Sequence, residues 1–256
     1  KNRNYEDNVL DVRLRTKVDD GGTYSTSGAV IYVKNEQSQT SGSISNTAHC
    51  IKIDNLSKEL IIIDDGSTDK TEKVINRLKI KYKNILSFSH RVNKGKGAAI
   101  KTGLKHISGD ILVIQDGDLE YNPEDFKKLI KPILQGATKV VYGSRMLGHV
   151  TGFIIPSHYY GNKFLTFLTK LLYKQKITDM ETCYKMMDVS VIQKIKIESN
   201  RFDFEPEITA KIIKKGYKIT EIPIDYHCRT FAEGKKINWK DGIVAIYKLL
   251  KYRVIG

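Results

Sequence analysis

The chain has 256 residues, 40% of them hydrophobic, which is enough for one large globular domain or two small ones. Its formal charge of +14 would attract phosphorylated ligands, nucleic acid or an anionic membrane surface. No apolar run reaches the ~20 residues of a membrane-spanning helix, and no recognition helix or zinc-finger spacing is present. The sequence therefore predicts a soluble chain and leaves nucleic acid as the least supported of these partners.

The first part of the chain carries the weakest structural signal. Residues 1–27 are polar and charged, so we expect a polar extension ahead of a single domain at 28–256. Residues 28–33 form a candidate first strand. Residues 35–47 are rich in Ser, Thr, Gln and Asn, which is a poor composition for the helix that an α/β fold would place there.

From Leu60 onward the pattern alternates between short apolar runs and amphipathic stretches. The apolar runs predict strands at 60–63, 85–88, 111–114, 139–142 and 217–224. The amphipathic stretches predict helices at 70–80, 93–106, 123–134, 159–173, 204–215 and 238–252, the last with one apolar stripe made by Trp239, Ile243, Ile246, Leu249 and Leu250. This alternation predicts an α/β fold with a mainly parallel twisted sheet flanked by helices.

The cysteines and histidines show no metal-binding spacing. The three cysteines, Cys50, Cys183 and Cys228, fit structural roles in a reducing cytosol. The six histidines form no pattern such as HExxH, so we expect them to be structural or surface residues.

Acidic residues follow two of the predicted strands directly. Asp64 and Asp65 follow the strand predicted at 60–63, and Asp116 and Asp118 flank Gly117 after the strand predicted at 111–114. In open α/β sheets ligands bind beyond the carboxyl ends of the strands, and two carboxylates can converge there on one divalent cation. Asp and Gly are also the commonest turn residues, so a solvated turn is the alternative.

A glycine- and lysine-rich turn, residues 93–99, opens the second predicted helix. Backbone N–H groups at a helix N-terminus can bind an anion, and Lys94 and Lys96 add positive charge; an ordinary glycine turn is the alternative. Together the motifs suggest a site for a nucleoside diphosphate. The chain has neither a P-loop nor a GxGxxG motif, so an NTPase and a dinucleotide oxidoreductase both fit poorly.

Four of these motifs, in this order, resemble those of the inverting family 2 glycosyltransferases of GT-A fold. They are DDGSTD at 64–69, NKGKGA at 93–98, DGDL at 116–119 and GSR at 143–145. Three further segments resemble C-terminal motifs of polyprenyl-phosphate (dolichyl-phosphate) mannose and glucose synthases: TDMETCYK at 178–185, FDFEPEIT at 202–209 and HCRTFAEGKKI at 227–237.

The resemblance implies an enzyme that transfers a hexose from UDP-glucose or GDP-mannose to a polyprenyl phosphate, with Mg²⁺ or Mn²⁺, at the cytoplasmic face of a membrane. It implies nucleotide-sugar contacts from Asn35, Glu36, Asp65, Lys94, Gly95 and Asp116, and metal ligands among Asp116, Asp118 and Glu120. It assigns the acceptor phosphate to Arg145, Arg229 and Lys235. Our candidate catalytic residues are Asp118, Arg145, Asp179 and Glu181. The basic surface and the aromatic helix at 159–173 would contact the membrane, and a homo-oligomer is left open.

Two alternatives remain at this stage. If the acceptor is a sugar hydroxyl, a carboxylate must take its proton, and Asp179 or Glu181 would do so unless they are a structural acidic pair. Alternatively, the domain binds without catalysis. The segment VIYVKNE at 30–36 motivates this second reading, because it keeps Asn35 and Glu36 but lacks the proline of the family pattern.

Overall fold

A computed structural model describes residues 28–34, 56–117, 120–152, 155–228 and 239–255, with the backbone alone given for 28–34. The predicted extension at 1–27 and the polar segment at 35–47 lie outside these ranges. Within them, no helix combines the length and the apolar character that crossing a membrane requires.

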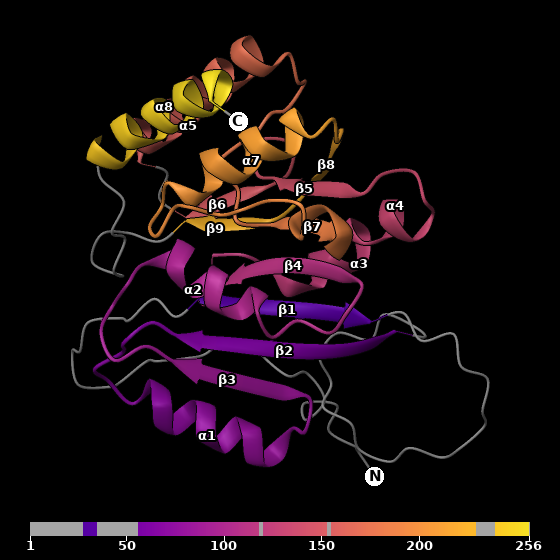
Figure 1. Ribbon diagram of the computed structural model, residues 1–256, viewed down its shortest axis with the longest axis vertical. Coiled ribbons are helices and arrows are strands. Elements are labelled where there is room, and N and C mark those ends of the chain that lie inside the picture. The colour runs from indigo at the N-terminus through magenta and orange to yellow at the C-terminus, as the bar shows by residue number, and fades with distance from the viewer. Residues whose placement is uncertain (1–27, 35–55, 118–119, 153–154, 229–238, 256) are drawn as a thin grey trace.

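A seven-stranded sheet forms the centre of the molecule, with its strands in the order β3-β2-β1-β4-β7-β5-β8. Figure 1 shows them stacked from β3 at the lower end to β5 and β8 at the upper end. Their bounds are β1 Gly28–Lys34, β2 Ser57–Asp64, β3 Ile85–Ser89, β4 Ile111–Asp116, β5 Val140–Ser144, β7 Lys185–Asp188 and β8 Ile219–Pro223. A separate pair joins β6 (Val150–Gly152) to β9 (Tyr226–Cys228).

Five of the seven strands run in one direction. β2 pairs in parallel with β3, and β5 with β8, whereas β1 and β7 run antiparallel to both of their neighbours. β2, β3, β4, β5 and β8 consequently end at one edge of the sheet, and β7 begins there. The prediction of a mainly parallel sheet is confirmed, although the two reversed strands separate most of the parallel ones.

Helices cover the sheet and form a further layer at its upper end. Their bounds are α1 Thr71–Lys81, α2 Lys96–Leu104, α3 Phe126–Leu129, α4 Lys131–Leu134, α5 Pro156–Tyr173, α6 Val189–Ile192, α7 Phe204–Lys214 and α8 Trp239–Val254, with a 3₁₀ turn η1 at Pro123–Asp125. α1 packs on β2 and β3, and α2 packs on β1 and β2. α7 is tied to β5 by the Tyr142 and Thr209 hydroxyls, 3.0 Å apart, and α5 and α8 pack against it as the outer layer (Figure 1).

The structure adds β6, β7, β9 and α6 to the predicted elements and gives further detail on three of the predicted helices. The helix expected at 123–134 is divided into η1, α3 and α4. The break between α3 and α4 falls where Pro132 has no N–H for a helical hydrogen bond and its ring crowds the preceding turn. α7 is buried at every position from Phe204 to Ala210 instead of on one face. In the stripe predicted on the last helix, Leu249 is buried, whereas Trp239 and Ile243 are exposed.

Candidate active site

The carboxylate of Asp65, at the end of β2, holds the glycine- and lysine-rich turn in place. Its Oδ1 accepts the N–H of Lys94 at 2.9 Å and its Oδ2 the N–H of Gly95 at 2.7 Å. His90 Nδ1 lies 2.6 Å from Oδ1, and the same ring contacts the Thr102 hydroxyl through Nε2 at 2.9 Å. Asp65 is only 3% exposed, and its hydrogen bonds join the ends of β2 and β3 to the beginning of α2 at the edge of the sheet.

The beginning of α2 packs closely against the loop that precedes α7. A Cβ added to Gly95 would lie 2.5 Å from the Asn200 carbonyl oxygen, and one on Gly97 would lie 2.6 Å from that of Ser199. Gly95 also has a φ of 97°, which disfavours other residues. The Ala98 N–H donates to Asn200 at 3.0 Å. Of the amides that we expected to bind an anion, those of Lys94, Gly95 and Ala98 therefore already donate within the protein.

Lys96 connects the end of β4 to α7. Its Nζ lies 2.8 Å from Asp116 Oδ1 and 2.6 Å from Glu205 Oε1, and its side chain is 12% exposed. Burial by itself lowers the pKa of Lys96, but Asp116 and Glu205 outweigh burial and hold that pKa well above its usual value. The Asp116 side chain is 26% exposed and that of Glu205 is 5% exposed, so Asp116 is the more accessible of the two carboxylates.

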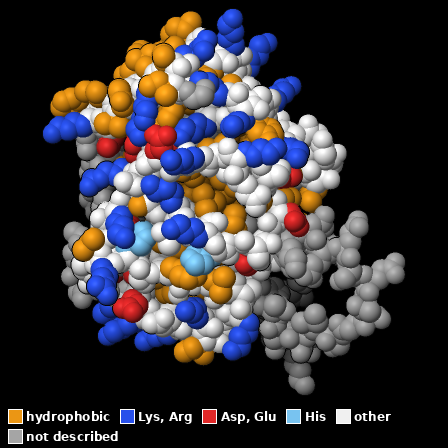
Figure 2. Space-filling view, in the orientation of Figure 1, with side chains coloured by type: hydrophobic (Ala, Val, Ile, Leu, Met, Phe, Trp, Pro, Cys, Tyr) orange, Lys and Arg blue, Asp and Glu red, His pale blue; other side chains and the backbone are white. Residues whose placement is uncertain are grey.

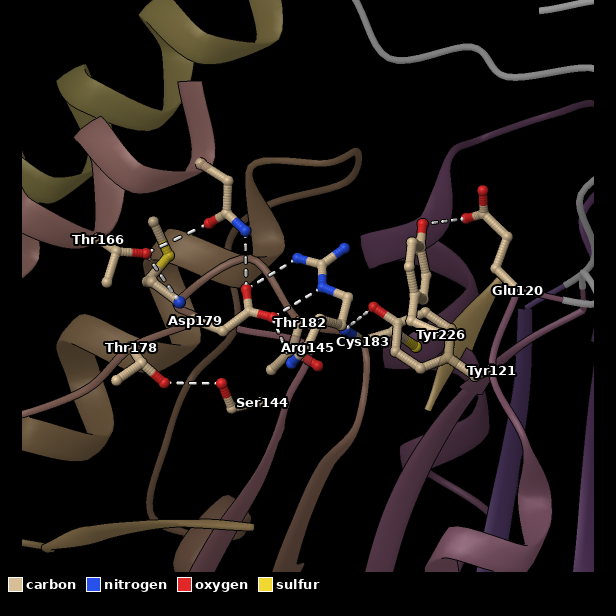
Figure 3. Close-up of polar contacts among 12 residues, drawn as sticks. Glu120, Tyr121, Ser144, Arg145, Thr166, Thr178, Asp179, Thr182, Cys183 and Tyr226 are labelled. Carbon is tan, nitrogen blue, oxygen red and sulfur yellow. Dashed lines mark hydrogen bonds and ion pairs between the residues drawn. The ribbon is translucent and has the colours of Figure 1, made fainter. Parts of the chain in front are cut away.

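Arg145, just after β5, is fixed by Asp179 in a fork geometry (Figure 3). Its Nε donates to Asp179 Oδ2 at 2.7 Å, a terminal guanidinium nitrogen donates to Oδ1 at 2.8 Å, and its backbone N–H donates to Oδ2 at 3.0 Å. Asn162 on α5 adds a fourth hydrogen bond at 2.9 Å. Burial alone raises the pKa of Asp179, but Arg145 outweighs burial and lowers that pKa below its usual value.

The loop that carries Asp179 is itself fixed on several sides. Thr178 donates its N–H and its hydroxyl to Glu221 on β8, at 2.7 and 2.9 Å, and its hydroxyl also lies 2.6 Å from that of Ser144. The Met180 N–H donates to the hydroxyl of Thr166 on α5 at 3.1 Å. Strands β5 and β8 and helix α5 thus determine together where Arg145 lies.

Aromatic rings line the other side of Arg145 (Figure 3). Its guanidinium carbon lies 5.0 Å from the ring centre of Tyr226 and 6.0 Å from that of Tyr121, within cation–π range. The Tyr226 hydroxyl donates to Glu120 at 2.7 Å, and the Tyr121 hydroxyl accepts the Cys183 N–H at 2.9 Å. Arg145 is 14% exposed, so its outer edge reaches solvent.

A second charged group, Glu181 and Lys185, lies deeper beside this site. Burial and the nearby Glu205 raise the pKa of Glu181 to about 8, although Lys185 acts in the opposite direction. Lys185 donates to the carbonyl oxygens of Met180 and Thr182, and burial lowers its pKa. Among the described residues, Glu181 Oε1 and Glu205 Oε2 are buried without a hydrogen-bond partner.

A family model described as "Glycosyl transferase family 2" matches residues 29–196, more than half of the chain. The chain belongs to glycosyltransferase family 2. The α/β architecture is that of the GT-A fold, as the solved structures below also indicate.

Two named relatives of this family 2 protein carry similar descriptions. A UDP-N-acetylglucosamine–dolichyl-phosphate N-acetylglucosaminyltransferase of Methanococcus voltae is 28% identical over 76% of this chain and 85% of its own length. A dolichyl-phosphate beta-glucosyltransferase of Trichomonas vaginalis is 29% identical over 66% of this chain and 54% of its own length. The family 2 protein thus resembles the dolichyl-phosphate sugar synthases, as the sequence motifs indicated.

Solved structures support the fold. Glucosyl-3-phosphoglycerate synthase from Mycobacterium tuberculosis in complex with UDP matches with a TM-score of 0.58, 17% identity and coverage of 77% of this chain and 69% of its own. The same enzyme with Mn²⁺, UDP and glucosyl-3-phosphoglycerate matches with a TM-score of 0.57 at 18% identity, over 77% of this chain and 70% of its own. At these identities the likeness establishes the GT-A fold alone.

The described part of the family 2 site fits a divalent metal only in part. Asp116 is an accessible carboxylate at the strand end, but Lys96 occupies both of its oxygens, at 2.8 and 3.0 Å. Glu120 accepts the Tyr226 hydroxyl, and no group of three His, Cys, Asp or Glu side chains suited to a metal occurs among the described residues. Asp118, the central predicted ligand, lies outside the described ranges.

The structure brings several predicted site residues to one edge of the sheet and adds others. Asp65, Lys94, Gly95, Asp116, Glu120, Arg145, Asp179 and Glu181 all lie at or next to that edge. Asn35, Glu36, Asp118, Arg229 and Lys235 fall outside the described residues. Sequence analysis missed four contacts of the site: His90 with Asp65, Asn162 with Asp179, Glu205 with Lys96 and Tyr226 with Glu120. The two residues of each pair are at least 17 positions apart, so no local pattern indicates them.

Proposed function

We propose that this family 2 enzyme transfers glucose or mannose from a nucleoside diphosphate sugar to a polyprenyl or dolichyl phosphate, with inversion at the anomeric carbon. The proposal extends the established family and the resemblance to dolichyl-phosphate sugar synthases to one donor class and one acceptor class. The N-acetylglucosaminyltransferase name of the Methanococcus voltae relative adds UDP-N-acetylglucosamine as a donor to be tested.

The hydrogen bonds that pair Asp179 with Arg145 support a phosphate acceptor. A general base must be free to take a proton, but both Asp179 oxygens accept hydrogen bonds and the pKa of this carboxyl is lowered. A phosphate monoester needs no such base, since its second pKa is about 6 and it is largely ionised at neutral pH. A guanidinium held in a fixed fork suits a phosphate acceptor instead.

In the proposed reaction, a phosphate oxygen of the acceptor attacks the anomeric carbon, and the bond from that carbon to the donor diphosphate breaks. Arg145 orients the acceptor phosphate, with Arg229 and Lys235 proposed to assist. Asp65, Lys94, Gly95, Asn35 and Glu36 are proposed to hold the nucleotide sugar. A divalent cation bound by Asp116 and Asp118, with Glu120 beside them, would stabilise the negative charge on the departing diphosphate.

The reaction is tested by transfer of radiolabelled sugar from UDP-glucose, GDP-mannose or UDP-N-acetylglucosamine to a polyprenyl phosphate, with Mn²⁺ or Mg²⁺ and with EDTA. The same lipid as an alcohol, without its phosphate, is the matched acceptor control. We expect metal-dependent label in the phosphate lipid alone. Label in the alcohol, or no label with any donor, would reject the proposed acceptor.

Glu181 supports a second candidate, transfer to a sugar hydroxyl. Its pKa of about 8 is close to the value that suits a general base at neutral pH, and its Oε1 has no hydrogen-bond partner among the described residues. Under this alternative, Glu181→Gln abolishes turnover. Under the phosphate-acceptor proposal, Glu181→Gln retains it, and Arg145→Lys raises the KM for the lipid.

A lipid acceptor implies work at a membrane surface. We propose that the protein acts as a peripheral enzyme at the cytoplasmic face, where nucleotide sugars are the donors.

A further inference from the structure

Lys96 holds two carboxylates together at the end of β4. Its ammonium nitrogen lies 2.8 Å from Asp116 Oδ1 and 3.0 Å from Asp116 Oδ2, so it spans that whole carboxylate. The same nitrogen lies 2.6 Å from Glu205 Oε1 on α7. The side chains of Asp116 and Glu205 are only 26% and 5% exposed, so without the ammonium the two negative charges would repel each other with little screening by water. Lys96 is therefore the resident cation of this part of the site.

The second oxygen of the Glu205 carboxylate is not used. Glu205 Oε2 is buried and has no hydrogen-bond partner among the residues that the structure describes. Lys185, a buried lysine that also interacts with Glu205 electrostatically, donates instead to the carbonyl oxygens of Met180 and Thr182. A buried oxygen without a donor costs free energy and is rare in native proteins. It leaves Glu205 able to accept Lys96 with both of its oxygens, as Asp116 does here.

The backbone of Lys96 is fixed, whereas its side chain can change partner. Gly95 and Gly97, on either side, pack against the carbonyl oxygens of Asn200 and Ser199 so closely that a Cβ at either glycine would collide with them. The beginning of α2 is thus held against the loop that precedes α7. The Lys96 ammonium is carried on a flexible four-carbon stem and already contacts both carboxylates. A change of partner needs only a rotation of this side chain.

Positive charge dominates the surface around α2. Figure 2 shows many Lys and Arg side chains and few Asp or Glu on the face of the molecule where Figure 1 places α2. The formal charge of the whole chain, +14, acts in the same direction. Such a field disfavours a cation at a distance, so the affinity for a divalent cation depends on the groups that touch it. At the end of β4 these groups are the Asp116 carboxylate and the ammonium that lies on it.

We propose that Lys96 competes with the divalent cation for Asp116, and that Glu205 receives the Lys96 ammonium when the cation binds. The metal-free protein keeps Asp116 neutralised by an internal ammonium, and metal binding exchanges one cation for another. The inference rests on the part of the proposed function that makes Asp116 a metal ligand. It adds Lys96 and Glu205 as the residues that set the affinity for the metal.

The experiment is titration of the full chain with Mn²⁺ alone, in which the electron paramagnetic resonance signal of free Mn²⁺ gives the dissociation constant. The variants are Lys96→Met, Glu205→Gln, the two combined, and Glu205→Asp, which keeps the charge but is one methylene shorter. Asp116→Asn shows whether the Mn²⁺ that is measured lies at this site. Far-UV circular dichroism checks that each variant is folded.

Two matched controls make the same changes of charge away from Asp116. Lys101→Met removes another lysine of α2, whose ammonium bonds to the Asn200 side chain. Glu198→Gln removes a carboxylate that pairs with Lys251 on α8. Both controls should match the Mn²⁺ affinity of the wild type within about twofold, because exposed charges at a distance are screened.

We expect Lys96→Met to bind Mn²⁺ at least about tenfold more tightly than the wild type, because no ammonium then occupies Asp116. Glu205→Gln and Glu205→Asp should each bind at least about tenfold more weakly, because Lys96 has lost its second position. In the Lys96→Met background, Glu205→Gln should change the dissociation constant by less than about threefold, since there is no ammonium to receive.

Several results would overturn the exchange of cations. Equal affinity of wild type and Lys96→Met, or no Mn²⁺ binding by either, shows that Lys96 does not compete. Wild-type affinity in Glu205→Asp, or an equal loss from Glu205→Gln with and without Lys96, shows that Glu205 acts through its charge alone. If Lys96→Met does not fold, the two Glu205 variants decide: weaker binding in both supports the exchange, and weaker binding in Glu205→Gln alone rejects it.

The titration also separates this inference from the proposed function, because neither donor nor acceptor is present. Unchanged affinity in Asp116→Asn rejects Asp116 as a metal ligand, and the exchange of cations fails with it. If the variants bind Mn²⁺ as expected but no acceptor is glycosylated, the proposed reaction fails and the exchange of cations stands.

Discussion

Replacing Asp179 by Asn tests whether this residue positions Arg145 or acts as a base. Asn has nearly the same shape but no charge, and its NH₂ group would face N–H donors of Arg145. The change therefore leaves a guanidinium that is only 14% exposed without its counter-charge. Asp179 itself is fully buried, so water cannot replace the lost contacts.

The magnitude follows from the burial of the pair. Removing one partner of a buried ion pair typically costs about 3–5 kcal/mol, and the partial exposure of Arg145 places this case near about 3 kcal/mol. A domain stable by about 5–15 kcal/mol would remain folded at room temperature. The lowered pKa of Asp179 means that this stabilisation is fully present above pH about 4 and is lost as the pH falls through the lower, folded-state pKa.

Urea denaturation followed by circular dichroism measures the stability, and Glu124→Gln is the matched control because its pair with Lys127 is exposed. We expect Asp179→Asn to lose about 3 kcal/mol, and Glu124→Gln at most about 1 kcal/mol. In transfer assays, a misplaced Arg145 raises the KM for the lipid phosphate. A loss of stability below about 1 kcal/mol, or a fall in kcat of about 10²-fold or more at unchanged KM, would refute the positioning role.

Three further changes test other parts of the site. Glu181→Gln should flatten the pH dependence of the unfolding free energy. In the wild type the pKa of Glu181 is raised to about 8, so unfolding releases a proton between pH about 4.5 and about 8, and the wild-type protein loses stability as the pH rises through that range. Gly97→Ala should lose about 1–3 kcal/mol, because its Cβ would lie 2.6 Å from a backbone carbonyl, whereas Gly161→Ala, with no atom within 4 Å, should gain about 0.5–1 kcal/mol. Lys96→Met should lower the unfolding free energy by about 3–5 kcal/mol. Because the change also frees the Asp116 carboxylate, Mn²⁺ should raise the melting temperature of this variant more than that of the wild type.

Each of these expectations has a contrary outcome. An unchanged slope of stability against pH in Glu181→Gln would show that this carboxyl is ionised in the folded protein. Equal effects of the two alanine substitutions would mean that the beginning of α2 can move away from the α7 loop. Equal Mn²⁺ stabilisation of wild type and Lys96→Met would argue against Asp116 as a metal ligand.

The sequence predicted the strands well because each is a compact run of apolar residues. The residues at 60–63 are at most 3% exposed, and the run beginning at Ile111 is similarly buried, so both runs stand out from their polar surroundings. Acidic residues directly after those runs predicted that Asp65 and Asp116 lie at one edge of the sheet, and the structure places them there because β2 and β4 run in the same direction. The predicted α/β sheet is confirmed, because the strands of the sheet are specified by local runs of apolar residues.

Other features could not be predicted from local pattern. Lys96 and Glu205 are more than 100 positions apart, yet their side chains meet at 2.6 Å, and nothing near either residue specifies the other. The antiparallel direction of β7 could not be predicted either, because the same apolar run is compatible with parallel and antiparallel pairing. The sequence predicted an apolar stripe on α8 but not its exposure, since periodicity shows that a face is apolar and not what covers it.

The reversed direction of β7 has a consequence for how this protein and its relatives can diversify. Because β7 starts at the edge where its neighbours end, the loop at 178–184 reaches that edge from ahead of a strand, on a segment separate from the one that carries Asp65 and Asp116. Under the proposed function, mutations that alter recognition of the acceptor therefore need not touch the segment proposed to hold the donor. A chimaera that exchanges residues 140–228 with those of a relative should change the acceptor while keeping the donor.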